Sequence, residues 1–274
     1  MLNYVGYIPL MKTILSITIA LILLVTVFLG STEFLRLYFP NDKNQEVTED
    51  IDSRKEDQVD NSYQYYKDNT LRVLITKLPF ELVYNPNQTR MVRDVAEDFD
   101  FKILINGGFF NANKEYAGAL IVDGELVSNP APLDKQLSHV VIYNKDLNQM
   151  YFELTTEFNP YSENYPLAFQ TGPLFLENNI VQEQYIDNSV NGNGEYLRSF
   201  IGYTDYNELV VGITTDGYSL KDLVEKILSI ELFEGKKLSL INLDGGSSVS
   251  LYAGKNSDLN YGELKTLPIL LGFK

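Results

Sequence analysis

Alternating apolar and polar residues predict most of the strands in this chain. Three short apolar runs read as single buried strands: "LRVLIT" (71–76), "FKILI" (101–105) and "LSLINL" (238–243). Four longer stretches hold two such runs around a turn and predict hairpins: "ALIVDGELV" with its turn at Asp123-Gly124, "HVVIYNKDLNQMYFEL", "PLFLENNIV" and "FIGYTDYNELVVGITT". The closing "LPILLGF" predicts a last strand.

Helical spacing occurs at two places. Met91, Val95 and Phe99 recur at four-residue intervals in 89–99, and Ser219 is placed to cap a helix that runs from Leu220 to about residue 230. Many hairpins with two or three helices, and no repeating strand–helix unit, predict the α+β class. We therefore expect a single β-rich domain of mostly antiparallel hairpins with two or three packed helices, preceded by a membrane anchor.

The amino end predicts that membrane anchor. Residues 14–29, "ILSITIALILLVTVFL", contain no charge and follow Lys12. This core is slightly shorter than the roughly 20 residues of a usual span. The following "VFLGSTE" has large residues where a signal peptidase needs small ones, so residues 1–32 are interpreted as a retained signal anchor rather than a cleaved signal peptide. The expected location is the cell membrane, single-pass, with the domain on the extracellular side, or secretion if the segment is cleaved.

An acidic spacer follows the anchor. Residues 41–62 contain eight acids, three bases and few apolar side chains. Such a composition is typical of a solvated, flexible segment. We therefore assign 33–62 to a flexible acidic spacer and 63–274 to the folded domain.

Composition excludes several classes of function. The chain has 274 residues, of which 45% are hydrophobic, and a net charge of −15, which argues against a nucleic-acid partner. It has no cysteine, so disulfides, thiol nucleophiles and zinc–thiolate sites are excluded. His139 is the only histidine, and because no nucleophile accompanies it in "QLSHVVIYN", it is interpreted as structural.

Five polar clusters interrupt the predicted strands. They are "NGGFF" (106–110), "QTGPLF" (170–175), "RSFIG" (198–202), "TTDGYS" (214–219) and "NLDGGSS" (242–248). Polar groups at a strand exit, with glycines that let a ligand approach the backbone, are a common way to build a site. An Asp-Gly pair is also a frequent plain turn, so each cluster taken alone is weak evidence.

Taken together, the five clusters resemble the phosphodiester glycosidase family. The resemblance runs from about residue 71 to residue 273 and keeps the family's order of motifs. The sequence departs from the family pattern at Ser247, Val249 and Tyr218, which bears on substrate choice more than on the fold. The resemblance implies a hydrolase that cleaves the glycosidic bond of sugar-1-phosphodiesters in cell-surface glycans.

The chemistry of that reaction calls for both signs of charge. Breaking the bond at the anomeric carbon puts positive charge on the sugar ring and negative charge on the departing phosphate. Arg198 is the predicted phosphate partner, because its guanidinium can contact two phosphate oxygens side by side. Asp244 is the predicted carboxylate, as general base, nucleophile or stabiliser of the ring cation. Asp216 or Glu195 would supply a second carboxylate, although phosphate leaves well without an acid.

The remaining cluster residues are expected to bind substrate through backbone N–H groups, an amide and short hydroxyls. For each of them a turn, a bulge or a local backbone hydrogen bond is an equally good interpretation. The predicted substrate-binding residues are Asn106, Gly107, Gly108, Thr171, Gly172, Gly245, Gly246, Ser247 and Ser248.

Three functions stay open at this point. The first is the anchored hydrolase, with a sugar-phosphodiester or cell-surface glycan as partner and the membrane bound through 14–29. The second is a non-catalytic saccharide- or phosphate-binding module of the same fold. The third is a metal-assisted phosphodiesterase. The sequence indicates no cofactor and no particular metal ligand, and only the third function would call for a divalent cation.

Overall fold

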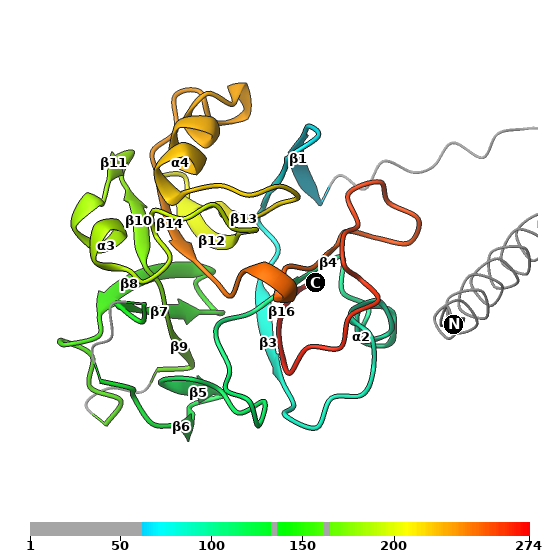
Figure 1. The fold of residues 1–274 in the computed structure, drawn as a ribbon. Coiled ribbons are helices and arrows are strands. Elements are labelled where there is room, and N and C mark those ends of the chain that lie inside the picture. Colours follow the sequence, from blue (N-terminus) through cyan, green and yellow to red (C-terminus); the bar gives the residue numbers. More distant parts are fainter. Residues whose placement is uncertain (1–61, 133–135, 162–164) are drawn as a thin grey trace, which may run out of the picture. The chain divides into compact units, whose positions relative to one another are not determined.

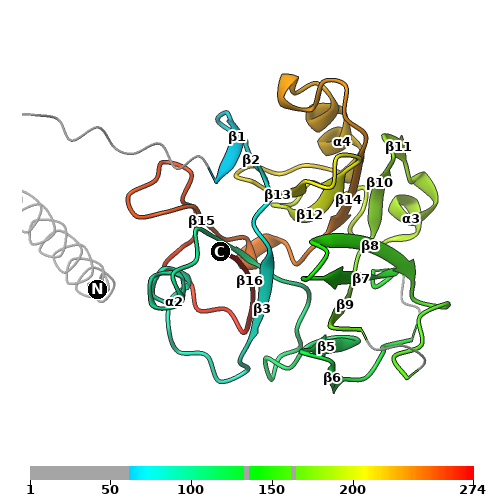
Figure 2. The same cartoon turned by 180° about the vertical axis from the view of Figure 1, so that it is seen from behind.

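Three antiparallel sheets build the part of the chain that this computed structural model describes, residues 62–132, 136–161 and 165–274 (Figures 1 and 2). These residues belong to one unit that spans Gln58–Lys274. The predicted anchor, 1–32, and residues 33–61 of the predicted spacer, 33–62, lie outside the described residues. Within the described ranges, no helix is long and apolar enough to cross a membrane.

The first sheet has seven strands in the order β1-β2-β13-β12-β14-β10-β11. Every neighbouring pair is antiparallel. Its strands are β1 (Tyr63–Lys67), β2 (Leu71–Thr76), β10 (Leu174–Glu177), β11 (Ile180–Val181), β12 (Ser199–Thr204), β13 (Leu209–Thr214) and β14 (Leu238–Asn242).

The other two sheets are smaller and also antiparallel. The second has the order β15-β4-β16-β3, and the third β6-β5-β9-β7-β8. The second consists of β3 (Phe80–Tyr84), β4 (Ile103–Asn106), β15 (Leu251–Tyr252) and β16 (Ile269–Phe273). The third consists of β5 (Leu120–Val122), β6 (Glu125–Ser128), β7 (His139–Asn144), β8 (Gln149–Leu154) and β9 (Leu167–Thr171).

Short helices cover the sheets. They are α2 (Val92–Phe99), α3 (Glu183–Asn188) and α4 (Leu220–Leu228), with single 3₁₀ turns η1 (Glu231–Phe233) and η2 (Gly246–Ser248). The Ser219 side chain accepts a hydrogen bond from the Asp222 backbone N–H at 3.1 Å, so the predicted cap is confirmed. Helix α2 begins at Val92, later than the periodicity suggested, because Met91 is still extended.

One apolar core joins the three sheets. Leu74 of the first sheet, Ile105 of the second and Phe169 of the third are fully buried in the same cluster. A second cluster lies between the first sheet and α4, and a third beneath α2. Burying each large apolar side chain contributes about 1.5–3 kcal/mol, so this shared core fixes the relative positions of the strand ends.

The predicted fold class is confirmed for the described domain. All four predicted hairpins form, and Asp123 and Gly124 both have positive φ, as the tight turn between β5 and β6 requires. The sequence analysis did not identify β1, β3, β9, β15 or α3. These are short or lie beside polar clusters, so their periodicity is weak.

Candidate active site

The five polar clusters meet at one end of the shared core. Strands β4, β9 and β14 finish there, and β12 begins there, so their flanking residues are neighbours. Asn106 reaches the main chain of Asp244, and the Thr171 hydroxyl donates to the Asn242 carbonyl at 2.9 Å. The sequence clusters are thus parts of a single structure.

The main chain of Asp244 is held from two sides. Its carbonyl oxygen accepts hydrogen bonds from the Asn106 side-chain amide at 2.7 Å and from the Ser199 hydroxyl at 2.5 Å. Its N–H donates to the Gly107 carbonyl at 3.2 Å. None of these bonds uses the carboxylate, whose partners are the Ser248 hydroxyl and the Gly245 backbone N–H.

Burial raises the pKa of the Asp244 carboxyl above its ordinary value, while the Ser248 hydroxyl and the Gly245 backbone N–H act in the opposite direction. Tyr116 lies close enough for the Asp244 charge to add to the effect of burial, and the pKa of this phenol is strongly raised. Its hydroxyl donates to the Gln170 carbonyl at 2.6 Å. The Asp244 carboxylate therefore lies among uncharged hydroxyl and amide groups.

Arg198 is buried and has no carboxylate partner in the described chain. Its Nε donates to the Tyr218 carbonyl at 2.9 Å, and its Nη2 to the carbonyls of Asn191 and Gly194, both at 2.7 Å. Burial lowers the pKa of Arg198 to about 10, and the ring of Tyr196 lies 5.3 Å from the guanidinium carbon. The side chain remains a cation at neutral pH.

The carbonyl contacts change the expected use of this arginine. The sequence predicted a side-by-side contact of the guanidinium with two phosphate oxygens. The edge formed by Nε and Nη2 is not available for it, because backbone oxygens occupy that edge. Nη1 makes no hydrogen bond within the described residues. A bound anion can therefore be met by Nη1 alone.

Asp244 and Arg198 line one cleft of about 250 Å³. Asp244 is the only carboxylate among the described residues that line it. The full lining is Phe109, Gln136, Pro173, Ser189, Asn191, Tyr196, Leu197, Arg198, Asn242, Asp244, Gly245, Gly246 and Ser247.

The loop after β14 approaches the segment before Arg198 closely. A Cβ on Gly245 would lie 2.6 Å from the Leu197 carbonyl oxygen, and the Gly246 N–H donates to that same oxygen at 2.9 Å. Gly246 also has a positive φ of 56°. The close approach at Gly245 and the positive φ at Gly246 explain why the loop has a glycine at each position. Of the two serines that follow, Ser247 is exposed at the rim and Ser248 is buried.

The other predicted substrate-binding residues support the cleft from behind and do not line it. The Asn106 side-chain amide donates to the Asp244 carbonyl and the Ser199 hydroxyl, and the Gly107 N–H donates to the Ile269 carbonyl at 3.0 Å. A Cβ on Gly108 would lie 2.4 Å from the Tyr116 hydroxyl oxygen. Thr171 and Gly172 both bond to Asn242, through its carbonyl and its amide nitrogen.

Neither candidate for a second carboxylate lines the cleft. Asp216 is exposed in the turn before Tyr218, where its Oδ1 accepts the Gly217 N–H at 2.8 Å. Glu195 is also exposed, and a Cβ added to Gly217 would lie 3.3 Å from its Cβ. The two-acid arrangement considered from the sequence therefore has no second member in this cleft.

Sequence reasoning missed Asn242, Ser199 and Tyr116. Asn242 is buried, its Nδ2 donates to the Gly172 and Leu243 carbonyls, and its buried Oδ1 accepts no hydrogen bond from the described residues. Ser199 and Asn242 belong to the polar clusters 198–202 and 242–248, so the sequence could have identified them as candidate site residues. Nothing in the sequence distinguished Tyr116 from the other tyrosines.

No metal centre is evident among the described residues. In residues 62–132, 136–161 and 165–274 there is no group of three or more His, Cys, Asp or Glu side chains arranged to hold a metal ion.

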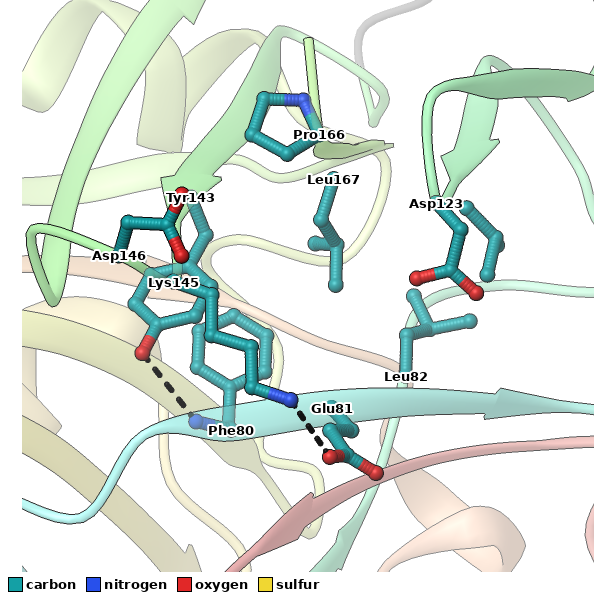
Figure 3. A pocket seen from close by; sticks show the side chains of 10 residues that line it. Phe80, Glu81, Leu82, Asp123, Tyr143, Lys145, Asp146, Pro166 and Leu167 are labelled. Atoms are coloured by element: carbon teal, nitrogen blue, oxygen red, sulfur yellow. Dashed lines mark hydrogen bonds and ion pairs between the residues drawn. The ribbon is translucent and has the colours of Figure 1, made fainter.

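A larger cavity of about 370 Å³ lies at the opposite end of β9 (Figure 3). Leu167, the first residue of β9, lines this cavity, while the last, Thr171, adjoins the Asp244 cleft. Its floor is apolar, and its lysine, Lys145, is bound to Glu81 at 2.7 Å, as the dashed line in Figure 3 shows. It contains none of the predicted site residues.

Comparison with known proteins decides the family. The family model for phosphodiester glycosidase matches residues 100–271, which include all five polar clusters. The chain belongs to the phosphodiester glycosidase family. No curated protein matches the chain by sequence.

Solved structures share the glycosidase fold at low identity. The zebrafish N-acetylglucosamine-1-phosphodiester alpha-N-acetylglucosaminidase catalytic domain, auto-inhibited by its pro-peptide, matches with a TM-score of 0.57 and 13% identity, over 77% of this chain and 81% of that one. A hypothetical protein from Synechocystis matches with a TM-score of 0.56 and 13% identity, over 77% of this chain and 61% of that one. At this identity the likeness concerns the fold.

Proposed function

We propose that this phosphodiester glycosidase family member hydrolyses the glycosidic bond of sugar-1-phosphodiesters in cell-surface glycans. The observation that carries the proposal is one cleft with a buried arginine that lacks a carboxylate partner and a single carboxylate whose main chain is fixed. A substrate with a phosphate next to a sugar matches this separation of charge. The zebrafish relative is named for action on such a phosphodiester.

In the proposed reaction, water adds its oxygen to the anomeric carbon and gives up one proton to the Asp244 carboxylate, from which it passes to the solvent, while the bond from that carbon to the phosphate oxygen breaks. The bonding electrons leave with the phosphate, and the products are a free sugar and a phosphate monoester. Nη1 of Arg198 contacts the phosphate as its negative charge grows, a charge-assisted hydrogen bond worth about 1.5–3 kcal/mol. The carboxylate of Asp244 lies against the sugar and offsets the positive charge of the ring.

One carboxylate is sufficient in this scheme because of the leaving group. An ordinary glycoside needs an acid to protonate its leaving oxygen, whereas a phosphodiester departs as a stabilised anion. The absence of a second carboxylate among the described lining residues agrees with this chemistry. The exposed positions of Asp216 and Glu195, outside the cleft, are then of no consequence for the bond-breaking step.

We also propose that the domain acts outside the membrane, held there by residues 14–29 and the acidic spacer. The support is the uncharged run and the acid-rich composition of 41–62. Membrane fractionation with protease added to intact cells tests this. A mature amino terminus near Ser31 would contradict the retained anchor and leave export in place.

The experiment for the activity is a panel of sugar-1-phosphate diesters incubated with the full-length chain in a nonionic detergent. Release of free sugar that is lost in a folded Asp244→Asn variant supports a hydrolase. Saturable binding of diesters without release, by both proteins, would instead indicate the saccharide- or phosphate-binding module.

A further inference from the structure

A third pocket, of about 280 Å³, lies between the edge strand β8 and helix α3. Figures 1 and 2 both show the β7–β8 hairpin beside α3. Its lining includes Tyr151, Phe152, Tyr185 and three glutamates. Phe152 lies on the same face of the sheet as His139, so its ring and that of Tyr185 supply the aromatic wall, whereas Tyr151 and Glu153 point to the opposite face of β8. No lysine or arginine is among the described residues that line it, so the pocket is not suited to a phosphate.

His139 gives this pocket a buried polar group. The side chain is 4% exposed, and its Nδ1 forms a hydrogen bond with the Ser138 hydroxyl at 2.8 Å. Its ring packs edge-on against Tyr185, with centroids 4.7 Å apart, and Nε2 has no hydrogen-bond partner in the described chain. Burial lowers the pKa of His139 to about 4, so the imidazole is uncharged at neutral pH and does not repel a cation.

Two of the glutamates are exposed and have no counter-charge among the described residues. Glu157 and Glu177 make no side-chain hydrogen bond and no ion pair with the described residues, although both line the pocket. Both are close enough to Tyr185 to add to the effect of burial in raising the pKa of its phenol. Two negative charges thus lie beside one aromatic ring without a cation between them.

We propose that this pocket binds a small alkylammonium ion, with its methyl groups against the aromatic rings and its charge beside Glu157 and Glu177. A cation over an aromatic face is attracted by the ring quadrupole, and the attraction grows when water is excluded. The carboxylates add a Coulomb term that a neutral ligand of the same shape lacks. The site uses neither Asp244 nor Arg198, so it does not rest on the proposed hydrolysis.

The test uses the one histidine of the chain as its probe. Full-length protein without a histidine tag, labelled with ¹³C-histidine, has a single imidazole signal, that of His139. We titrate it with choline and with dimethylbutanol, the neutral isostere in which carbon replaces the ammonium nitrogen. Choline should shift the His139 signal saturably, and the isostere should bind several-fold more weakly.

Variants separate this site from general charge effects. Each of Glu157→Gln and Glu177→Gln should weaken choline binding about two- to fivefold, the range for exposed ion pairs, and the double variant roughly tenfold. Glu125→Gln, at the exposed opposite edge of the same sheet, is the matched control and should bind as the unaltered protein does. Asp244→Asn should also bind choline normally.

Three results would overturn the proposal: an unmoved His139 signal, equal affinity for choline and its isostere, or full affinity in the folded Glu157/Glu177 double variant. Failure of hydrolysis with normal choline binding would reject the proposed function alone.

Discussion

Replacing Asp244 by asparagine removes the only carboxylate among the described residues of the cleft and hardly changes the shape of the side chain. The fold around it should persist, because the bonds from Asn106, Ser199 and Gly107 all go to the main chain of residue 244. The asparagine oxygen can still accept from the Ser248 hydroxyl. The variant therefore isolates the charge from the scaffold.

The effect on stability has a definite sign. The pKa of Asp244 is higher in the folded protein than its ordinary value, so ionisation of this carboxyl opposes folding. That penalty is absent below the unfolded pKa and develops as the pH rises through the folded pKa. At neutral pH the Asp244→Asn variant should therefore melt at the same temperature as the unaltered protein, or higher.

The effect on catalysis should be large and opposite. Loss of a positioned acid or base costs about 10²–10⁴ in rate, which corresponds to about 2.7–5.4 kcal/mol of transition-state stabilisation. We expect kcat/KM on a chromogenic sugar-phosphodiester to fall by this factor. Asp216→Asn, the same chemical change in an exposed turn, is the matched control and should keep nearly full activity.

The reasoning would be refuted by near-normal kcat/KM in an Asp244→Asn protein that melts normally. In that case the "LDGGSS" segment is a turn at the end of β14, and the cleft has no catalytic role. A loss of activity equal in Asp216→Asn and Asp244→Asn would also contradict the assignment, because it would move the chemistry outside the cleft.

Four further predictions follow from the same contacts. Arg198→Lys should lower both kcat/KM and the melting temperature. The ammonium is a single point, whereas the three carbonyls are contacted from two separate nitrogens, Nε and Nη2, and each group left unsatisfied costs about 1–3 kcal/mol; a normal melting curve would contradict the described contacts. Asn106→Ala should destabilise by about 1–3 kcal/mol in urea unfolding, since the buried Ser250 N–H loses its acceptor. Ser248→Ala should reduce kcat/KM only about two- to twelvefold, the equivalent of one neutral hydrogen bond of roughly 0.5–1.5 kcal/mol. In a pH–rate profile, kcat/KM should fall on acidification through a pKa above the ordinary aspartate value, and Asp244→Asn should lack that acid limb.

The hairpins were predictable because their signals are local. In β5–β6, two apolar runs flank Asp123-Gly124, and the turn alone sets the pairing. The helix α4 was equally accessible, because Ser219 and the apolar face that follows it lie within one window of sequence. Such elements depend on neighbours a few residues away, which a single sequence displays directly.

The site was predictable only as a set of residue types. The sequence identified the clusters around Asn106 and Asp244 as candidates. Only the folded chain shows that the Asn106 amide donates its hydrogen bond to the Asp244 carbonyl, 138 residues away, rather than to a substrate. The carbonyls of Asn191, Gly194 and Tyr218 that hold Arg198 have no signature in sequence, because every residue carries a carbonyl. Which partner a polar group bonds to, and whether all of its donors and acceptors are used, depends on the tertiary structure.

The most direct test of the central claim is the position of ¹⁸O after hydrolysis of a sugar-1-phosphodiester in labelled water. The account predicts label on the anomeric hydroxyl of the released sugar and an unlabelled phosphate monoester. The reason is that water attacks the anomeric carbon, while Arg198 binds the phosphate that leaves. Label on the phosphate would mean that the phosphorus–oxygen bond breaks, and the assignment of Asp244 to the sugar would be wrong.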